Sequence, residues 1–189
     1  MHIVIFASGN GSNAENIINY FSDDENVTVS TVFSNKNSAK VLERANNLNA
    51  GTIAFNKKAF QDPACILKIL EALKPDLIVL AGFLWKVPTH IVTAFSGKII
   101  NIHPALLPKY GGKGMFGMNV HEAVLANKEQ ETGITIHYVN EEYDEGAIIF
   151  QKSVAVQSSD TAETIAAKVH ELEYNYFPKI IENVLYGKL

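Results

Sequence analysis

Short apolar runs alternate with amphipathic segments along the first hundred residues of the chain. The apolar runs are typical of buried strands, and the segments between them have the apolar spacing of helices. Parallel strands need a crossover connection, usually a helix, so this alternation indicates βαβ units. We expect strands at Ile3–Ala7, Val27–Phe33, Thr52–Phe55, Leu77–Ala81 and Lys98–Ile102, with helices at Ser12–Phe21, Ala39–Leu48, Ala64–Leu73 and Ile91–Phe95.

The pattern changes after Pro108. Tyr110–Met118 contains glycine at 111, 112, 114 and 117, which predicts a loop rather than a regular element. Beyond it the apolar positions indicate one more helix, two strands joined by a polar turn, and a final helix. These elements are expected at Val120–Ala126, Ile134–Val139, Ala147–Val156 and, after a capping box at Asp160–Glu163, along the stripe Ile165, Val169, Leu172 and Tyr176.

Together the elements predict an α/β fold built on one mostly parallel, twisted sheet. Helices should cover both faces, because crossovers between parallel strands are right-handed, and the C-terminal part should add an antiparallel element. The length of 189 residues suits one domain with a single core, so we expect a single domain over residues 1–189. Hydrophobic residues at 47% and charged residues at 19% are typical of a folded globular chain.

Charge and cysteine content indicate the cellular compartment and the kind of partner to expect. A formal net charge of −4 and a pI near 5.9 argue against a nucleic-acid-binding surface. Cys65 stands alone and cannot form an internal disulfide, which favours a reducing compartment. The longest uncharged apolar run, Leu77–Trp85, is too short to cross a bilayer, and residues 1–6 lack the layout of a signal peptide. We therefore expect a cytoplasmic protein with small-molecule partners, without nucleic acid or membrane.

A glycine turn follows the first predicted strand. Gly9–Ala14 fits the dinucleotide fingerprint G-x-G-x-x-G/A, but the second strand ends without the acidic residue that holds a ribose hydroxyl. Ser12 with Glu15 forms a capping motif, and the N–H groups of Gly11, Ser12 and Asn13 can approach an anion at the helix start. This favours a phosphomonoester site over NAD; a tight turn without a ligand is the alternative.

The segment Asn101–Pro108 follows the fifth predicted strand and carries the clearest candidate chemistry. In extended backbone Asn101 and His103 point to the same side, and Pro104 keeps His103 out of helical dihedrals. An amide that donates a hydrogen bond beside an imidazole that exchanges a proton suits a reaction at a carbonyl. Alternatively, Asn101 caps a turn and His103 is an ordinary partly buried histidine.

Asp144 lies in the turn between the last two predicted strands. If that turn reaches the edge where His103 lies, its carboxylate should raise the pKa of His103 and orient the ring. A simple turn aspartate is the alternative. The other histidines are weaker candidates: His137 reads as half-buried on a strand, whereas His121 and His170 lie on helices that look exposed. None of them has metal-ligand spacing, so we expect no metal site.

These segments, in this order and spacing, resemble the phosphoribosylglycinamide formyltransferases, folate-dependent enzymes of purine synthesis. The resemblance covers essentially all of the chain. It rests on Ile5–Asn13, Val32–Lys36, Leu80–Phe83, Asn101–Lys109 and Tyr143–Gly146.

The resemblance implies a role for particular residues. The catalytic residues would be Asn101, His103 and Asp144. Some members of the family carry Arg where this chain has Trp85 and Pro63; Trp85 itself could wall a flat ligand or simply belong to the core or surface. The implied phosphate and glycinamide ribonucleotide contacts are Gly11, Ser12, Asn13, His170, Glu171, Leu172 and Glu173, and the implied folate contacts are Leu84, Trp85, Lys86, Val87, Asn101, Asn140, Glu141, Glu142, Tyr143 and Asp144.

The implied reaction is transfer of a formyl group from 10-formyltetrahydrofolate to the amine of glycinamide ribonucleotide, without a metal. Asn101 and protonated His103 would stabilise the tetrahedral intermediate, with Asp144 supporting the imidazole. Two alternatives stay open. Methionyl-tRNA formyltransferases share the core but add a tRNA-binding domain and basic surface, and a non-enzymatic nucleotide-binding module would use only Gly11–Asn13. The sequence leaves the choice between monomer and homodimer open.

Overall fold

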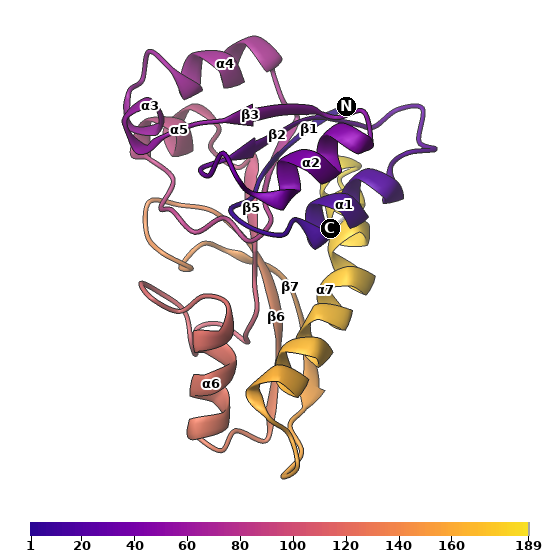
Figure 1. Ribbon diagram of the computed structural model, residues 1–189, viewed down its shortest axis with the longest axis vertical. Helices are drawn as coiled ribbons and strands as arrows, with labels where there is room; N and C mark the ends of the chain where they lie inside the picture. Colours follow the sequence, from indigo (N-terminus) through magenta and orange to yellow (C-terminus); the bar gives the residue numbers. More distant parts are fainter. Residues whose placement is uncertain (189) are drawn as a thin grey trace.

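The computed structural model describes residues 1–188, which fold around one seven-stranded mixed sheet (Figure 1). The strands at one side of the sheet pair in parallel, and the last two pairings, β5 with β6 and β6 with β7, are antiparallel. The predicted α/β class with an antiparallel C-terminal element is therefore confirmed. The spatial order is β3-β2-β1-β4-β5-β6-β7, with β1 (His2–Phe6), β2 (Thr28–Ser34), β3 (Gly51–Ala54), β4 (Leu77–Leu80), β5 (Ile99–His103), β6 (Glu131–Tyr138) and β7 (Ile148–Ala155).

Helices connect the parallel strands and close both faces of the sheet. One helix was missed in the sequence: a short turn of helix after Asn56, whose side chain accepts the N–H of Ala59. It precedes the predicted helix that begins at Ile66 rather than Ala64. The helices are α1 (Ser12–Tyr20), α2 (Lys40–Asn47), α3 (Lys57–Gln61), α4 (Ile66–Leu73), α5 (Thr89–Ala94), α6 (Met118–Ala126) and α7 (Ala162–Leu185).

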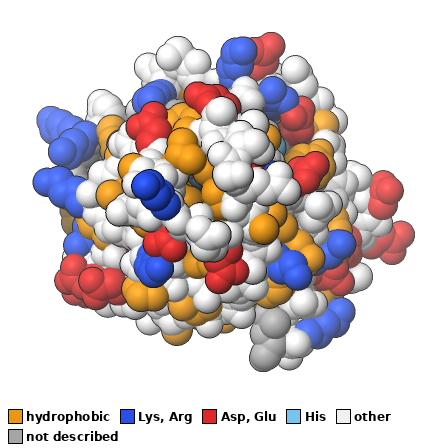
Figure 2. Space-filling model, turned by 90° about the horizontal axis from the view of Figure 1, so that it is seen from below, with side chains coloured by type: hydrophobic (Ala, Val, Ile, Leu, Met, Phe, Trp, Pro, Cys, Tyr) orange, Lys and Arg blue, Asp and Glu red, His pale blue; other side chains and the backbone are white. Residues whose placement is uncertain are grey.

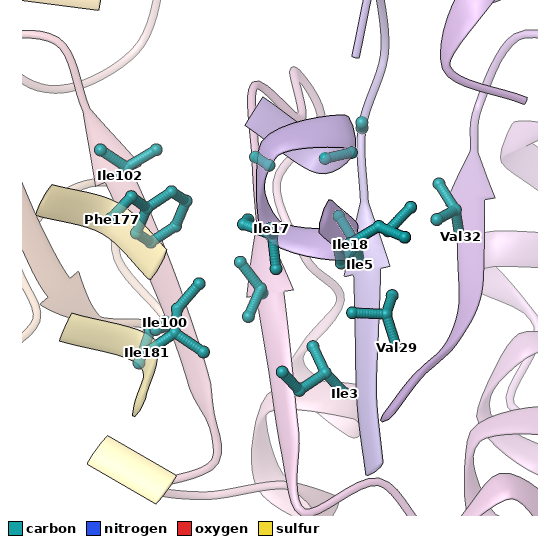
Figure 3. Packing of buried hydrophobic residues seen from close by; sticks show 14 of the residues in the cluster. Ile3, Ile5, Ile17, Ile18, Val29, Val32, Ile100, Ile102, Phe177 and Ile181 are labelled. Carbon is teal, nitrogen blue, oxygen red and sulfur yellow. The ribbon is translucent and has the colours of Figure 1, made fainter. Parts of the chain in front are cut away.

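The core lies in two layers, one on each face of the sheet. On one face α1, α2 and α7 pack on the strands, with Ile17, Phe177 and Ile181 against Ile3, Ile5 and Ile100 (Figure 3). On the other face α3, α4 and α5 cover an aromatic cluster in which Phe6 stacks on Phe33 with 4.8 Å between ring centroids. Strands buried on both faces explain why they read as continuous apolar runs.

Two predicted helix caps are wrong by one residue. Gly11, not Ser12, is the N-cap of α1; its φ of 80° is left-handed, and a Cβ there would overlap Val41. Glu15 pairs with Arg44 instead of closing a capping box. At α7 the capping box uses Thr161 and Thr164 rather than Asp160 and Glu163. Asp160 instead binds the ammonium of Lys168 and the hydroxyl of Thr164.

The strand order reverses between β1 and β4, which places the site. The chain runs from β1 outward to β2 and β3, then returns to add β4 and β5 on the other side of β1. Open α/β sheets bind ligands at the carboxyl ends of the strands beside such a reversal. Here Ser8 joins the two loops, because its N–H donates to Gly82 O at 3.1 Å and its Oγ accepts the N–H of Leu84 at 2.9 Å.

The long helix α7 runs beside both halves of the molecule. Figure 1 shows its start near α6 and its later turns near α1. Within residues 1–188 no helix has the length and apolar character needed to cross a membrane. On the face drawn in Figure 2, acidic and basic side chains are interspersed with apolar ones between them.

Candidate active site

The loops after β1, β4 and β5 surround a cavity of about 520 Å³. Asn13 comes from the start of α1, Gly82 to Leu84 from the loop after β4, and Asn101 and His103 from β5. Asp144 and Glu173 enter from the β6–β7 turn and from α7. Segments far apart in sequence therefore meet at the carboxyl edge of the parallel strands.

Asn101 is oriented by a histidine on the neighbouring strand. The antiparallel register pairs Asn101 with His137, and Asn101 Nδ2 lies 3.1 Å from His137 Nε2. His137 Nδ1 lies 2.8 Å from the carbonyl of Tyr138, which can only accept, so Nδ1 carries the hydrogen. In the neutral ring Nε2 then accepts from the Asn101 amide. The second N–H of that amide stays available for a ligand.

His103 is a buried histidine with one nitrogen fixed by the backbone. Its Nε2 donates to the carbonyl of Tyr110 at 2.7 Å, and its Nδ1 lies 3.7 Å from Asp144 Oδ2. Burial lowers the pKa of His103, and the Asp144 carboxylate and Tyr110 carbonyl, which raise it, only partly offset this effect. The predicted effect of Asp144 is confirmed, because its carboxylate raises the pKa of His103, but burial outweighs it and the net pKa lies below the ordinary value. At neutral pH the resting ring is neutral, with its lone pair on Nδ1.

Asp144 is held in the site by a constrained turn. Its backbone is left-handed, with φ of 56°, and its Oδ2 accepts the N–H of Gly112 at 2.8 Å. Its Oδ1 lies 3.7 Å from His137 Nε2. Burial raises the pKa of Asp144, but the contacts with His137 and Gly112 lower that pKa by a larger amount, so the net pKa lies below the ordinary value. A carboxylate at neutral pH thus faces two histidine rings.

The start of α1, which follows the first strand of the chain, contributes Asn13 to the main cavity. The first N–H groups of a helix lack intrahelical partners, and the N-cap Gly11 offers no side chain to bind them. Asn13 Nδ2 donates to Glu173 Oε2 at 2.8 Å, while His170 Nδ1 lies 3.3 Å from the same oxygen. The Asn13 Oδ1 atom is buried without a partner in residues 1–188. Asn13 therefore brings the start of α1 to the cavity wall, beside the Glu173 carboxylate.

A smaller cavity of about 70 Å³ adjoins the first along the loop after β4. Leu84, Asn101, Tyr143 and Asp144 line both cavities. Trp85 lines the smaller one but also packs on Phe55 and Phe60, with 6.1 Å between centroids in each pair. Its ring therefore belongs to the aromatic cluster and to the cavity wall together.

The structure brings together most, but not all, of the residues expected from the sequence. Glu173 and His170 reach the main cavity, and Lys86 Nζ lies 5.4 Å from the centroid of the Tyr143 ring. The expected residues that line neither cavity are Gly11, Ser12, Glu171, Leu172 and Glu141, whereas Asn13, Leu84, Trp85, Lys86, Val87, Asn101, His103, Asn140, Glu142, Tyr143 and Asp144 line at least one.

Two histidines that the sequence marks only as weak candidates, His137 and His121, belong to the site. His137 is 2% exposed and holds Asn101, and His121 is 5% exposed and lines the main cavity. Nothing local marks His137, because its role depends on the β5–β6 register. His121 had a weak signal: it lies three residues before Val124 on α6, and both side chains are buried.

Comparison with known proteins identifies the family of this chain. A family model described as "Formyl transferase" matches residues 1–181. The chain belongs to the formyl transferase family. It is similar to the phosphoribosylglycinamide formyltransferase of Bacillus subtilis, at 36% identity over 96% of this chain and 93% of that one, and to that of Escherichia coli, at 36% identity over 100% and 89%.

Solved structures give the same placement within the formyl transferase family. The phosphoribosylglycinamide formyltransferase of Anaplasma phagocytophilum superposes with a TM-score of 0.90 at 34% identity, covering 100% of this chain and 88% of that chain. That of Bacillus halodurans gives a TM-score of 0.88 at 32% identity, covering 98% and 95%. The chain is thus a formyltransferase of the phosphoribosylglycinamide formyltransferase type, and the family implies a folate co-substrate.

Proposed function

We propose that this chain transfers the formyl group of 10-formyltetrahydrofolate to the amine of N1-(5-phosphoribosyl)glycinamide, a step of purine biosynthesis, with residues 1–189 acting as one catalytic domain. The observation that carries the proposal is the meeting of Asn101, His103 and Asp144 on one wall of the main cavity. An amide donor, a proton carrier and a carboxylate suit attack by an amine on a formyl carbon.

The folate supplies the formyl carbon, and the protein supplies donors and a proton path. The free N–H of Asn101 donates to the formyl oxygen as that oxygen gains negative charge. Because His137 already holds the other N–H, the amide does not have to reorient during the reaction. A donor fixed before the reaction stabilises developing charge without the cost of reorganisation.

His103 moves the proton. Its Nε2 hydrogen is committed to Tyr110, so Nδ1 is the nitrogen that accepts a proton from the attacking amine. The resulting imidazolium lies 3.7 Å from Asp144, whose lowered pKa keeps it ionised. His103 then gives the proton to the departing folate nitrogen. This differs from a ring that is protonated at rest, because the neutral resting state makes His103 a base first and an acid second.

The ends of the cavity suit the two substrates. The phosphate of the acceptor would bind at the start of α1, at Gly11, Ser12 and Asn13, where helix N–H groups favour an anion. Glu173, held by Asn13 and His170, would bind the acceptor between its phosphate and its amine. The folate ring would lie on Leu84 and Tyr143, beside the smaller cavity lined by Trp85 to Val87 and Asn140 to Asp144.

A spectrophotometric assay of folate deformylation tests the proposal. The folate product should form only when glycinamide ribonucleotide is present, in equal amount to the formylated acceptor. Formylation of methionyl-tRNA instead would assign the chain to the related tRNA enzymes. Binding of glycinamide ribonucleotide without transfer would indicate a nucleotide-binding module.

A further inference from the structure

His121 is a buried histidine in the main cavity that the proposed mechanism does not use. It lies on α6 and is 5% exposed, and its ring lines the cavity together with His103 and Glu173. Within residues 1–188 its Nδ1 atom is buried and has no hydrogen-bond partner. Buried polar atoms in folded proteins are almost always paired. An unpaired nitrogen on a cavity wall therefore points to a partner supplied by a ligand.

The charge state of the ring limits what that partner can be. Burial lowers the pKa of His121; the Glu173 carboxylate raises it in part, and His103 lowers it further. The ring is therefore neutral at pH 7, with one N–H donor and one lone pair. A neutral imidazole adds no charge to hold a phosphate, but it matches a hydroxyl group, which both donates and accepts.

The position of the ring selects one part of the acceptor substrate. In the proposed function the phosphate binds beside Asn13 and the amine reacts beside Asn101 and His103. The sugar joins these two ends, and Glu173 and His121 are wall residues close enough to influence each other electrostatically. We propose that His121 hydrogen-bonds a sugar hydroxyl of the acceptor, alongside the Glu173 carboxylate; the proposal rests on the function proposed above.

Substitution of the ring and of the substrate tests this positioning role together. His121→Phe keeps the ring size and removes both hydrogen-bonding atoms, whereas His121→Asn keeps a donor and an acceptor. For His121→Phe we expect kcat/KM for the acceptor to fall about 5- to 10-fold through KM, as for one lost neutral hydrogen bond, with the folate KM unchanged. His121→Asn should recover part of the loss.

Acceptors that lack the 2′- or the 3′-hydroxyl identify the contact. With the wild type, each deoxy acceptor should lose affinity, and in His121→Phe one of the two losses should disappear because its partner is already gone. His90→Phe is the matched control. His90 lies on α5 with a buried, unpaired Nε2 but outside the lining of the main cavity, so this variant should keep wild-type kinetics.

The outcomes separate the two proposals. If the wild type transfers formyl groups but His121→Phe has an unchanged acceptor KM and keeps both deoxy penalties, the role of His121 is overturned and the function stands. If the wild type transfers none, both proposals fail. Should His121→Phe not fold, the Nδ1 chemical shift of His121 in the wild type decides: a change on adding glycinamide ribonucleotide without folate supports the contact, and none overturns it.

Discussion

The two halves of the sheet, the parallel side from β1 to β4 and the antiparallel side from β5 to β7, differ in the side chains that they bury. Strands β1 to β4 and their helices bury apolar and aromatic side chains, such as Phe6, Phe33 and Phe60, each at most 2% exposed. Strands β5 and β6 also bury isoleucines but add the buried histidines His103 and His137, and the loops beside them hold the left-handed non-glycine residues Tyr110 and Asp144. Buried polar groups and strained backbone concentrate where a fold carries function.

The contrast assigns a task to each side. The two apolar layers, which include most of the buried residues of β1 to β4, stabilise the fold and so fix the carboxyl ends of β1, β4 and β5. The antiparallel side carries buried polar groups that bind and move protons, and burying these groups lowers the free energy of unfolding. Substitutions on the first side should therefore change the free energy of unfolding, and substitutions on the second should change turnover.

The largest effect on turnover is expected for His103→Ala. General acid–base catalysis by one side chain contributes about 10²- to 10⁴-fold, so kcat should fall by that factor while the chain still folds. Single-turnover formyl transfer, measured beside the melting temperature, checks both parts. A variant with near-normal kcat would remove His103 from the mechanism.

On the parallel side, Phe60→Ala should lower the stability of the fold and leave turnover unchanged. Phe60 is 1% exposed and contacts Phe6, Phe55 and Phe83 in the aromatic cluster. Loss of a buried phenylalanine ring destabilises a protein by about 3–5 kcal/mol, through lost transfer free energy and the cavity left behind. Urea unfolding measures that loss. The kcat below the melting range should stay at the wild-type value, and a fall like that of His103→Ala would contradict the division.

The sequence predicts the elements of the parallel side better than the contacts of the antiparallel side, because element type depends on local spacing and strand pairing does not. On the parallel side the element type follows from local apolar spacing, so the strands and four of the helices were predicted to within a few residues; α3 was missed because it is a single short turn fixed by Asn56. The pairing of Asn101 with His137 depends on strand register, which local spacing does not encode.

The candidate site shows the same limit. Asn101 and His103 stand in one recognisable segment, and Asp144 was a candidate because the predicted turn between the last two strands could reach the same edge; the resemblance then gave it a catalytic role. The buried state of His121 and the net fall in the pKa of His103 arise from packing between distant segments. Burial is a property of the assembled fold, so the sign of that pKa shift could not be read from the neighbouring carboxylate alone.

Asp144→Asn sharpens the comparison within the antiparallel side. The amide oxygen can still accept the N–H of Gly112, but the charge that raises the pKa of His103 is lost, so that pKa should fall further. An NMR titration of the His103 ring measures it, with the exposed Glu43→Gln as a control that removes one remote charge. An unchanged titration would reject the coupling.

The same shift predicts how stability depends on pH. The folded pKa of His103 lies below its ordinary value of 6.5, so as pH falls through 6.5 the unfolded chain binds a proton before the folded one. The contribution of neutral His103 to the free energy of unfolding is therefore complete above pH 6.5. It is lost as pH falls from 6.5 to the folded pKa. In Asp144→Asn that window should extend to lower pH, which urea unfolding at a series of pH values would detect.

The smallest effect is expected at Lys113, in the glycine-rich loop. Its exposed ammonium lines the main cavity, so it can add positive charge for the acceptor phosphate. Exposed charge pairs contribute about 0.2–1 kcal/mol, so Lys113→Met should raise the acceptor KM only about 1.5- to 5-fold at low salt. Lys109→Met is the matched control, because Lys109 lies on the same segment but binds Glu129 at 3.0 Å and lines a different cavity.

Salt and substrate decide what Lys113 contacts. An electrostatic contribution to the acceptor KM should disappear at about 1 M salt, where the screening length is about 3 Å. A rise in the folate KM instead would place the ammonium against the folate. If neither KM changes in Lys113→Met, the glycine-rich loop contributes backbone contacts, such as Gly112 to Asp144, and the charge that holds the phosphate comes from the start of α1 alone.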